Sequence, residues 1–447
     1  MFNPNSDADR TAMLKTIGVE SVADLFKVVP ARHRFPELDL PDALTEMEAL
    51  QDLQELASAN YTTQEMPSFL GAGAYNHYVP AAVGAIISRG EFLTAYTPYQ
   101  PEVSQGTLQA IFEYQSMICQ LTGMDVSNAS HYDGATAAAE AVNMSQAITR
   151  GKRKKIVLAP SLHPHYRQTI HTYSQGTDLQ FVGEDLALDA GPEALLPLLD
   201  KDTALVMVQY PDFFGRVYDY TELAGAVHAA GALLGVSVNP MALGMLKPPS
   251  EFGADIVTGE GQPLGIPLSY GGPYLGILAT RDKYVRSLAG RLIGETTDSR
   301  GQRGFVLTLS TREQHIRRER ASSNICTNQG LMALSATVYM SLVGKQGLRE
   351  AAELSYHKAH YAAEKIAALD GYELWSDAPF FNEFVVRTPH PAEAVNSHLL
   401  DHSILGGYDL GQSYPDMQNY LMFAVTEMNR RDEIDYLVDV LAEASND

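Results

Sequence analysis

Residues 204–238, ALVMVQYPDFFGRVYDYTELAGAVHAAGALLGVSV, place two apolar runs of strand length, 204–210 and 233–238, on either side of a helix-length segment. The same alternation continues along the chain, with further apolar runs at 156–159, 179–182, 256–258 and 274–279. Continuous apolar strands that alternate with helices are typical of a parallel sheet with helices on both faces. The central part of the chain therefore predicts an α/β domain.

The regions on either side of this centre have other patterns. Helix-start signals at Ser6 and Thr45, with prolines between them, predict an N-terminal helical arm over residues 1–65. The C-terminal region begins with long helical segments and continues with short apolar strands and further helices, which predicts a smaller α+β domain over 328–447. The large α/β domain then spans 66–327.

The charge balance limits the partners that the chain can take. Its 447 residues include 32 Lys plus Arg and 54 Asp plus Glu, a net charge of -22, so nucleic acid and anionic membranes are repelled. Residues 223–246 carry no charge and are long enough to cross a bilayer, but glycines and Pro240 interrupt them, which favours buried helix and strand. The N-terminus lacks the pattern of a secretory signal. We expect no nucleic-acid partner, no membrane span and a cytoplasmic location.

Cysteines and histidines form no recognisable metal-binding pattern. Cys119 and Cys326 lie far apart without a CxxC partner, which indicates two reduced thiols. His163 and His165 flank a proline and have no third ligand nearby, which favours a role at the surface or at a helix start. We therefore predict no metal site.

Two polar segments precede expected helices. Residues 96–106, YTPYQPEVSQG, hold two phenols, two amides and a carboxylate on a proline-held loop that could bind a ligand or partner, or could be an ordinary loop with Ser104 near the helix N-cap. Residues 130–137, SHYDGATA, place small residues and free amides at a helix N-terminus, where an anion could dock or the helix could pack closely on the sheet. The Gly71–Gly73 segment, GAG, lacks the preceding strand of a dinucleotide-binding fingerprint, which argues against a Rossmann site.

These two polar segments, together with residues 307–319 and 321–329, closely resemble the glycine cleavage system P protein family. The similarity runs through nearly the whole chain and includes residues 13–19, 69–73 and 248–256. The length matches the split form of the family, in which the N-terminal half is a separate alpha subunit. The resemblance implies a fold-type I, aspartate aminotransferase-like large domain. It also implies glycine decarboxylation with pyridoxal phosphate (PLP) and delivery of the aminomethyl group to a lipoyl-bearing H protein.

The residues also indicate which half of such an enzyme this chain forms. A PLP enzyme ordinarily holds its cofactor as a Schiff base on a lysine, which the fold places near residues 259–265. No lysine lies between Lys247 and Lys283, and Asn239 stands where an aspartate would keep the pyridine nitrogen protonated. We expect no covalently bound cofactor and a vestigial pocket formed by Asp133, Gly134, Ala135, Thr136 and Asn239.

By the same resemblance, PLP is bound by a homologous subunit 2 (beta) in an α2β2 assembly that serves lipoylated H protein. Fold-type I sites lie near subunit interfaces, so this chain can contribute to its partner's pocket. The shared-site candidates are Tyr96, Tyr99, Gln100, Glu102 and Ser104.

A second set of candidates can equally form salt bridges within the fold or to the partner: Arg312, His315, Arg317 and Arg318. Two rival functions stay open. One is a scaffold that only docks subunit 2 or H protein, and the other is an autonomous PLP-dependent lyase or transferase with a displaced lysine.

Overall fold

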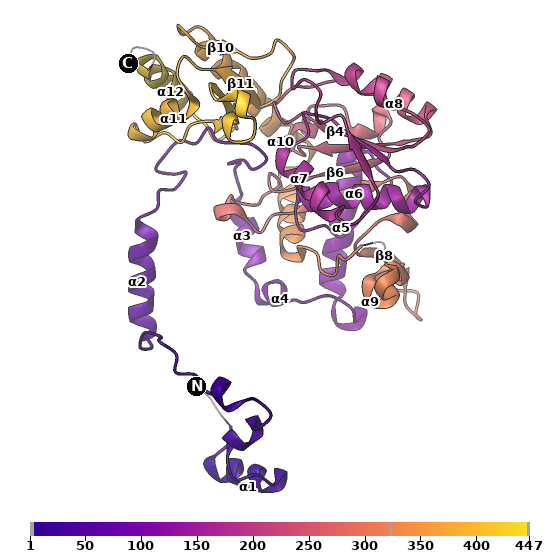
Figure 1. Cartoon of the computed structure of the whole chain (residues 1–447), viewed down its shortest axis with the longest axis vertical. Coiled ribbons are helices and arrows are strands. Elements are labelled where there is room, and N and C mark those ends of the chain that lie inside the picture. Colours follow the sequence, from indigo (N-terminus) through magenta and orange to yellow (C-terminus); the bar gives the residue numbers. More distant parts are fainter. Residues whose placement is uncertain (1–3, 322, 445–447) are drawn as a thin grey trace. The chain divides into compact units, whose positions relative to one another are not determined.

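The computed structural model describes residues 4–321 and 323–444, and its contacts divide the chain into two units, Met1–Tyr61 and Thr62–Asp447. Ser6 and Thr45 cap helices of the first unit, as the sequence analysis predicted, and none of the described residues of this unit is buried. The helices of this unit are α1 (Asp7–Ile17), η1 (Val22–Phe26), η2 (Ala31–His33) and α2 (Glu46–Ser58) (Figure 1).

The second unit is built on a seven-stranded sheet with the order β1-β7-β6-β5-β4-β2-β3. Strands β2 to β6 lie parallel to one another, which confirms the predicted parallel sheet. The prediction is wrong for β7, which runs antiparallel to β6. The described segment between them contains the 3₁₀ turn η7 (Ser269–Gly271) and no crossover helix, and a parallel pair needs a crossover. The strands are β1 (Val126–Ser127), β2 (Lys155–Leu158), β3 (Gln180–Val182), β4 (Thr203–Tyr210), β5 (Leu233–Val238), β6 (Ile256–Glu260) and β7 (Gly276–Thr280).

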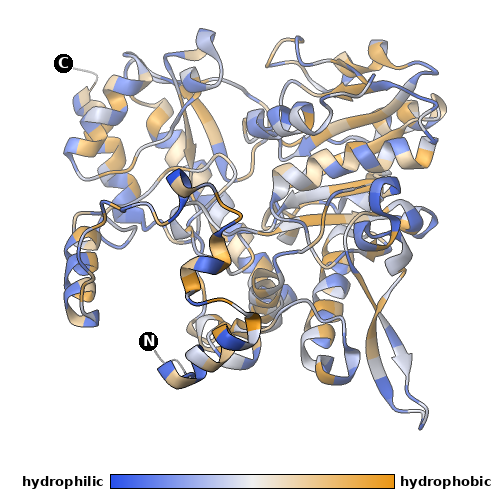
Figure 2. Ribbon diagram, turned by 60° about the horizontal axis from the view of Figure 1, so that its bottom comes forward, coloured by the Kyte–Doolittle hydropathy of each residue, from blue (hydrophilic) through white to orange (hydrophobic). Residues whose placement is uncertain are grey.

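Both faces of this sheet are buried. Val206 and Val208 of β4 belong to one hydrophobic cluster, whereas Leu205 and Met207 belong to another, as the two-residue period of a strand requires. Figure 2 shows these central strands mostly in the colour of hydrophobic residues. Helices of this part are α3 (Ala81–Ile87), α4 (Gly90–Leu93), α5 (Gln105–Thr122), α6 (Gly134–Thr149), α7 (Pro164–Tyr173) and α8 (Thr221–Ala229). Its 3₁₀ helices are η3 (Pro101–Val103), η4 (Pro192–Leu198), η5 (Ala242–Gly244), η6 (Pro249–Phe252) and η8 (Asp282–Ser287).

A β-hairpin that the sequence analysis did not predict follows the large sheet. Its strands β8 (Leu292–Thr297) and β9 (Arg303–Thr308) are antiparallel, and the turn between them is held by Asp298, which accepts hydrogen bonds from the N–H groups of Arg300 and Gln302. The short helices η9 (Ser310–Arg312), α9 (Gln314–Arg317) and η10 (Arg318–Arg320) come next.

The C-terminal part holds a second, four-stranded antiparallel sheet with the order β10-β11-β13-β12. The two predicted helices before it form one long element, α10 (Gly330–Ala367), broken at Gly344, which has a φ of 60°. The other elements are β10 (Glu373–Leu374), β11 (Glu383–Arg387), α11 (Ala392–Asp401), β12 (Tyr408–Asp409), η11 (Leu410–Gln412), η12 (Pro415–Met417), β13 (Tyr420–Ala424) and α12 (Arg431–Ala444).

Both sheets belong to one contact unit, so the division at residue 327 into a large and a small domain stays a prediction. Among the described residues, none of the helices combines the length and the apolar character that crossing a bilayer requires.

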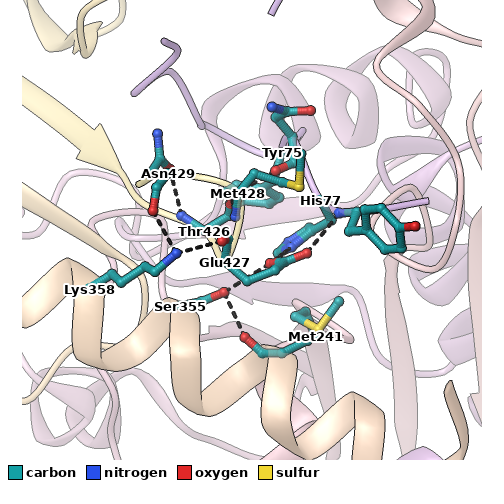
Figure 3. A network of polar contacts seen from close by, with 12 residues as sticks. Tyr75, His77, Met241, Ser355, Lys358, Thr426, Glu427, Met428 and Asn429 are labelled. Carbon is teal, nitrogen blue, oxygen red and sulfur yellow. Dashed lines mark hydrogen bonds and ion pairs between the residues drawn. The ribbon is translucent and has the colours of Figure 1, made fainter. Parts of the chain in front are cut away.

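A strap of residues 68–78 connects the two sheets. Its Tyr75 exchanges backbone hydrogen bonds with the side chain of Gln262, which follows β6, and donates its hydroxyl to Glu383 of β11 at 2.7 Å. Farther along, His77 Nδ1 lies 2.7 Å from Glu427 Oε2, and Lys358 of α10 donates to the Glu427 carbonyl oxygen (Figure 3). The strap therefore has a structural role, because it is bonded both to the segment after β6 and to β11.

Candidate functional site

At the N-terminus of α6, which the sequence analysis assigned to a vestigial cofactor pocket, the backbone N–H groups of Gly134 and Thr136 are engaged by side chains of the chain itself. Asp133 is the N-cap, and its Oδ1 accepts a hydrogen bond from Thr136 N–H at 2.7 Å. Gly134 N–H donates to Glu260 Oε2 at 2.9 Å. A carboxylate from the end of β6 therefore lies where a helix N-terminus would bind an anion.

Glu260 is 8% exposed and is held by backbone donors on three sides. Besides Gly134, the N–H groups of Gln262 and Leu275 donate to its Oε1 at 3.0 and 2.9 Å. Burial raises the pKa of Glu260 to about 7, although these three backbone hydrogen bonds lower it.

Close packing fixes the neighbouring residues of this pocket. A Cβ at Gly134 would collide with Tyr166 Oη and lie 3.0 Å from the Glu260 nitrogen, so only glycine fits there. Asn239, just after β5, is half-buried, and its Oδ1 accepts a hydrogen bond from Met241 N–H at 3.0 Å. Ala135 is the second residue of α6. The structure thus places Asp133, Gly134, Ala135 and Thr136 at one helix start and Asn239 on the turn after β5.

Both flanking lysines are exposed on the surface rather than buried at the carboxyl end of β6. Lys283 is exposed, and its Nζ lies 3.7 Å from Asp255, just before the opposite end of β6. Lys247 is exposed as well. With Glu260 on the helix N-terminus and these lysines outside, the residues present do not fit covalently bound PLP.

The predicted shared-site residues lie on and beside the exposed loop before α5. Tyr96 is 80% exposed and Tyr99 is 46% exposed, and Gln100, at the N-cap of η3, and Glu102, within η3, are exposed as well. Ser104 occupies the N-cap position of α5, but its side chain makes no capping hydrogen bond within the described residues.

Tyr99 meets a buried arginine that the sequence analysis did not single out. Arg291 Nη2 donates to Tyr99 Oη at 3.3 Å, and its guanidinium carbon lies 5.4 Å from the centre of the tyrosine ring. On its other sides, Arg291 Nη1 donates to Asn328 Oδ1 at 3.4 Å, and Nε lies 3.8 Å from Glu313 Oε2. His315 contacts Tyr99 edge-on at 5.5 Å between ring centres. We call these five residues, Tyr99, Arg291, Glu313, His315 and Asn328, the Arg291 cluster.

The hydrogen-bonding capacity of the Arg291 cluster is only partly used. Among the described residues, Arg291 Nε and Glu313 Oε1 are buried without a hydrogen-bond partner. Buried polar atoms of this kind are uncommon and mark places where a ligand or partner can complete the bonding. A cavity of about 180 Å³ adjoins the cluster, and its lining includes Tyr96, Arg291 and Asn328.

The second set of candidates separates in the structure. Of these four residues, His315 joins the Arg291 cluster, whereas Arg312 donates to the backbone carbonyl oxygens of Leu288, Gly290 and Leu309. Arg317 and Arg318 are exposed. His163, considered earlier for metal, is the N-cap of α7, where its Nδ1 accepts a hydrogen bond from His165 N–H.

Sequence reasoning missed Arg291 because its partners lie far from it along the chain. A single arginine before an apolar pair, Leu292 and Ile293, carries no motif. The only available signal is the presence of a charged residue next to a strand-like run, which a buried ion pair would explain.

The fold is that of the fold-type I PLP enzymes, with one sheet strand antiparallel to the others and a smaller antiparallel sheet in the C-terminal part. A glutamate decarboxylase of Lactobacillus brevis shares this fold, with a TM-score of 0.68 at 13% identity over 96% of this chain and 97% of that one.

Within this class, the chain belongs to the glycine cleavage system P-protein family, whose sequence model matches residues 2–441. A relative from Thermomicrobium roseum, named "Probable glycine dehydrogenase (decarboxylating) subunit 1", is 56% identical over 447 residues and all of both chains. A crystal structure titled glycine decarboxylase (P-protein) of the glycine cleavage system, in inhibitor-bound form, superposes with a TM-score of 0.92 at 41% identity and covers 99% of each chain.

Proposed function

We propose that this chain is the alpha subunit of a two-chain glycine decarboxylase. With a homologous subunit 2 it decarboxylates glycine and passes the aminomethyl group to the lipoyl arm of H protein, in an α2β2 assembly in the cytoplasm. The full-length match to a relative named as subunit 1 supports this assignment. So does the likeness over 99% of both chains to a structure titled glycine decarboxylase.

In this proposal PLP is held by subunit 2. When bound there, PLP supplies an electron sink for the carbanion that remains after carbon dioxide leaves. The observation that carries the division of labour is Glu260, whose carboxylate occupies the α6 N-terminus of this chain. The lack of any lysine between Lys247 and Lys283 points the same way.

The contribution of this chain is to complete the partner's pocket without covalent chemistry. Tyr99 and Arg291 present a phenol and a guanidinium beside an exposed loop that carries Tyr96, Gln100 and Glu102. Such groups can orient glycine or the dihydrolipoyl sulfur, and exact placement of reacting groups is worth several kcal/mol of barrier. Ser104 ends the loop at the N-cap position of α5 and is a further polar group beside it.

Reconstitution tests the division of labour. The purified chain alone should show no exchange of label between bicarbonate and the glycine carboxyl, and exchange should appear when subunit 2, PLP and H protein are added. The chain alone, mixed with PLP and then dialysed free of unbound PLP before borohydride treatment, should retain no covalently bound chromophore. Exchange by the chain alone, or a borohydride-fixed chromophore on it, would support the autonomous enzyme instead.

The scaffold alternative is favoured by the exposure of Tyr96, Gln100 and Glu102, because exposed side chains also serve docking. Tyr99→Phe and Glu102→Gln in the reconstituted complex distinguish the two. If the loop completes the site, turnover falls at least tenfold while assembly is unchanged. Tyr436→Phe is a matched control, since Tyr436 is 44% exposed and also makes one hydrogen bond of 3.3 Å. Unchanged turnover in all three variants would favour the scaffold.

A further inference from the structure

Two histidines and a glutamate come together in the C-terminal part of the chain. His398 lies in α11 and His402 follows one turn later at its C-cap, and Glu443 lies in α12. One potential ligand atom from each of the three lies within 4.8 Å of the other two. Figure 1 shows α11 and α12 beside each other, so the group bridges two helices.

The hydrogen bonds of His402 leave one ring nitrogen free to act as a ligand. His402 Nδ1 lies 2.9 Å from the carbonyl oxygen of His398. A carbonyl oxygen only accepts, so Nδ1 carries the proton and Nε2 of the neutral ring keeps its lone pair. A histidine that binds a metal commonly donates its other N–H to a backbone carbonyl in this way.

His398, the second histidine of the group, also has an unused ring nitrogen. Its Nε2 is buried and, among the described residues, has no hydrogen-bond partner. The two imidazole rings lie 4.6 Å apart between centres. An i, i+4 pair of histidines on one helix is a common source of two metal ligands.

The third ligand lies at a distance that suits an ion better than a hydrogen bond. His402 Nε2 and Glu443 Oε2 are 3.7 Å apart. A tetrahedral zinc ion with bonds of about 2.1 Å separates its ligands by roughly 3.4 Å. The pair His171–Glu184 differs, because its two atoms are in direct hydrogen-bond contact at 2.8 Å.

We propose that His398, His402 and Glu443 form a binding site for a divalent transition metal, with Zn²⁺ the expected ion, that ties α11 to α12. Two imidazole nitrogens and one carboxylate oxygen are a ligand set that suits zinc rather than calcium or magnesium. Water completes the fourth position. The expectation of no metal site rested on patterns close together in sequence, and Glu443 lies on another helix.

Titration of the 447-residue chain with zinc chloride tests the site. After treatment with a chelator, the chain should bind one zinc ion in calorimetry, in competition with a chelator of known affinity, and zinc should raise its melting temperature. His402→Gln should abolish this binding, and Glu443→Gln should weaken it at least tenfold. His171→Gln is the matched control and should bind zinc like the parent chain.

Two results would overturn the proposal. One is the absence of one-to-one binding in a chain whose circular dichroism shows that it is folded. The other is binding that persists unchanged in the Glu443→Gln variant and in a His398→Gln, His402→Gln double variant. Glu443 is 65% exposed, so the fold does not depend on its side chain and this variant remains informative if a histidine variant fails to fold.

Discussion

The N-terminus of α6 and the Arg291–Glu313 pair both hold buried polar side chains, but they differ in how far their hydrogen bonds are satisfied. Glu260 accepts three backbone N–H groups at the first. At the second, Arg291 Nε and Glu313 Oε1 have no hydrogen-bond partner among the described residues. The comparison shows that the presence of buried charged groups does not by itself leave a place for a ligand. What matters is whether their hydrogen-bonding atoms already have partners within the chain. The Glu260 carboxyl thus has both oxygens bonded, whereas the Arg291–Glu313 pair keeps a donor and an acceptor that a ligand could use.

Removing Arg291 should have the largest effect on stability, because it leaves the carboxylate of Glu313 buried without its counter-charge. Arg291→Met should lower the free energy of unfolding by about 3–5 kcal/mol in urea titrations. Arg303→Met, which breaks the exposed ion pair with Glu295, is the control and should cost less than about 1 kcal/mol. Similar losses in the two variants would mean that Arg291 is not effectively desolvated.

A change at Glu260 tests the closed region through its pH dependence. The folded chain holds a proton on Glu260 up to a pKa of about 7, whereas the ordinary value is 4.5, so stability falls as the pH rises between these values. The Glu260→Gln variant has no carboxyl to titrate here. Its free energy of unfolding should therefore rise by roughly 2–3 kcal/mol relative to that of the parent chain between pH 5 and pH 8. Denaturant titrations across that range measure it.

The exposed Glu319 supplies the control for this experiment. Glu319→Gln should leave the pH profile of stability as it is in the parent chain. Parallel profiles for the Glu260→Gln variant and the parent chain would contradict the raised pKa of Glu260.

The smallest of the three effects concerns the packing at Gly134. Gly134→Ala forces a Cβ against Tyr166 and should destabilise the chain by about 2 kcal/mol in thermal or urea unfolding. Gly225→Ala in α8 is the matched variant. A Cβ there meets nothing within 4 Å, so this change should stabilise by about 0.5–1 kcal/mol. If both variants changed the free energy of unfolding in the same direction, α6 would not pack as closely as described.

The large sheet could be predicted from sequence because its strands are continuous apolar runs, and the predicted run 233–238 coincides with β5. The hairpin β8–β9 escaped prediction, since it is half-exposed and its residues alternate less clearly. The antiparallel direction of β7 depends on a missing crossover helix, which periodicity alone does not reveal.

The candidate site was predictable only in its local part. The loop with Tyr96 and Tyr99 showed itself by its polar, proline-held composition. Arg291, in contrast, is 192 residues from Tyr99, and Glu260 is 126 residues from Gly134. Contacts over such separations arise from the tertiary fold and leave no pattern in a single sequence. The roles of the predicted residues stay predictions.

The strap between the two sheets restricts how the second unit can deform. Tyr75 is bonded to Gln262 on one side and to Glu383 on the other, and His77 adds a bond to Glu427. If the four-stranded sheet rotated against the large sheet, the strap would have to break either its hydrogen bonds to Gln262 or those to Glu383 and Glu427. The two sheets should therefore travel as a rigid body, and any opening that admits a substrate has to come from loop motion or from a partner chain.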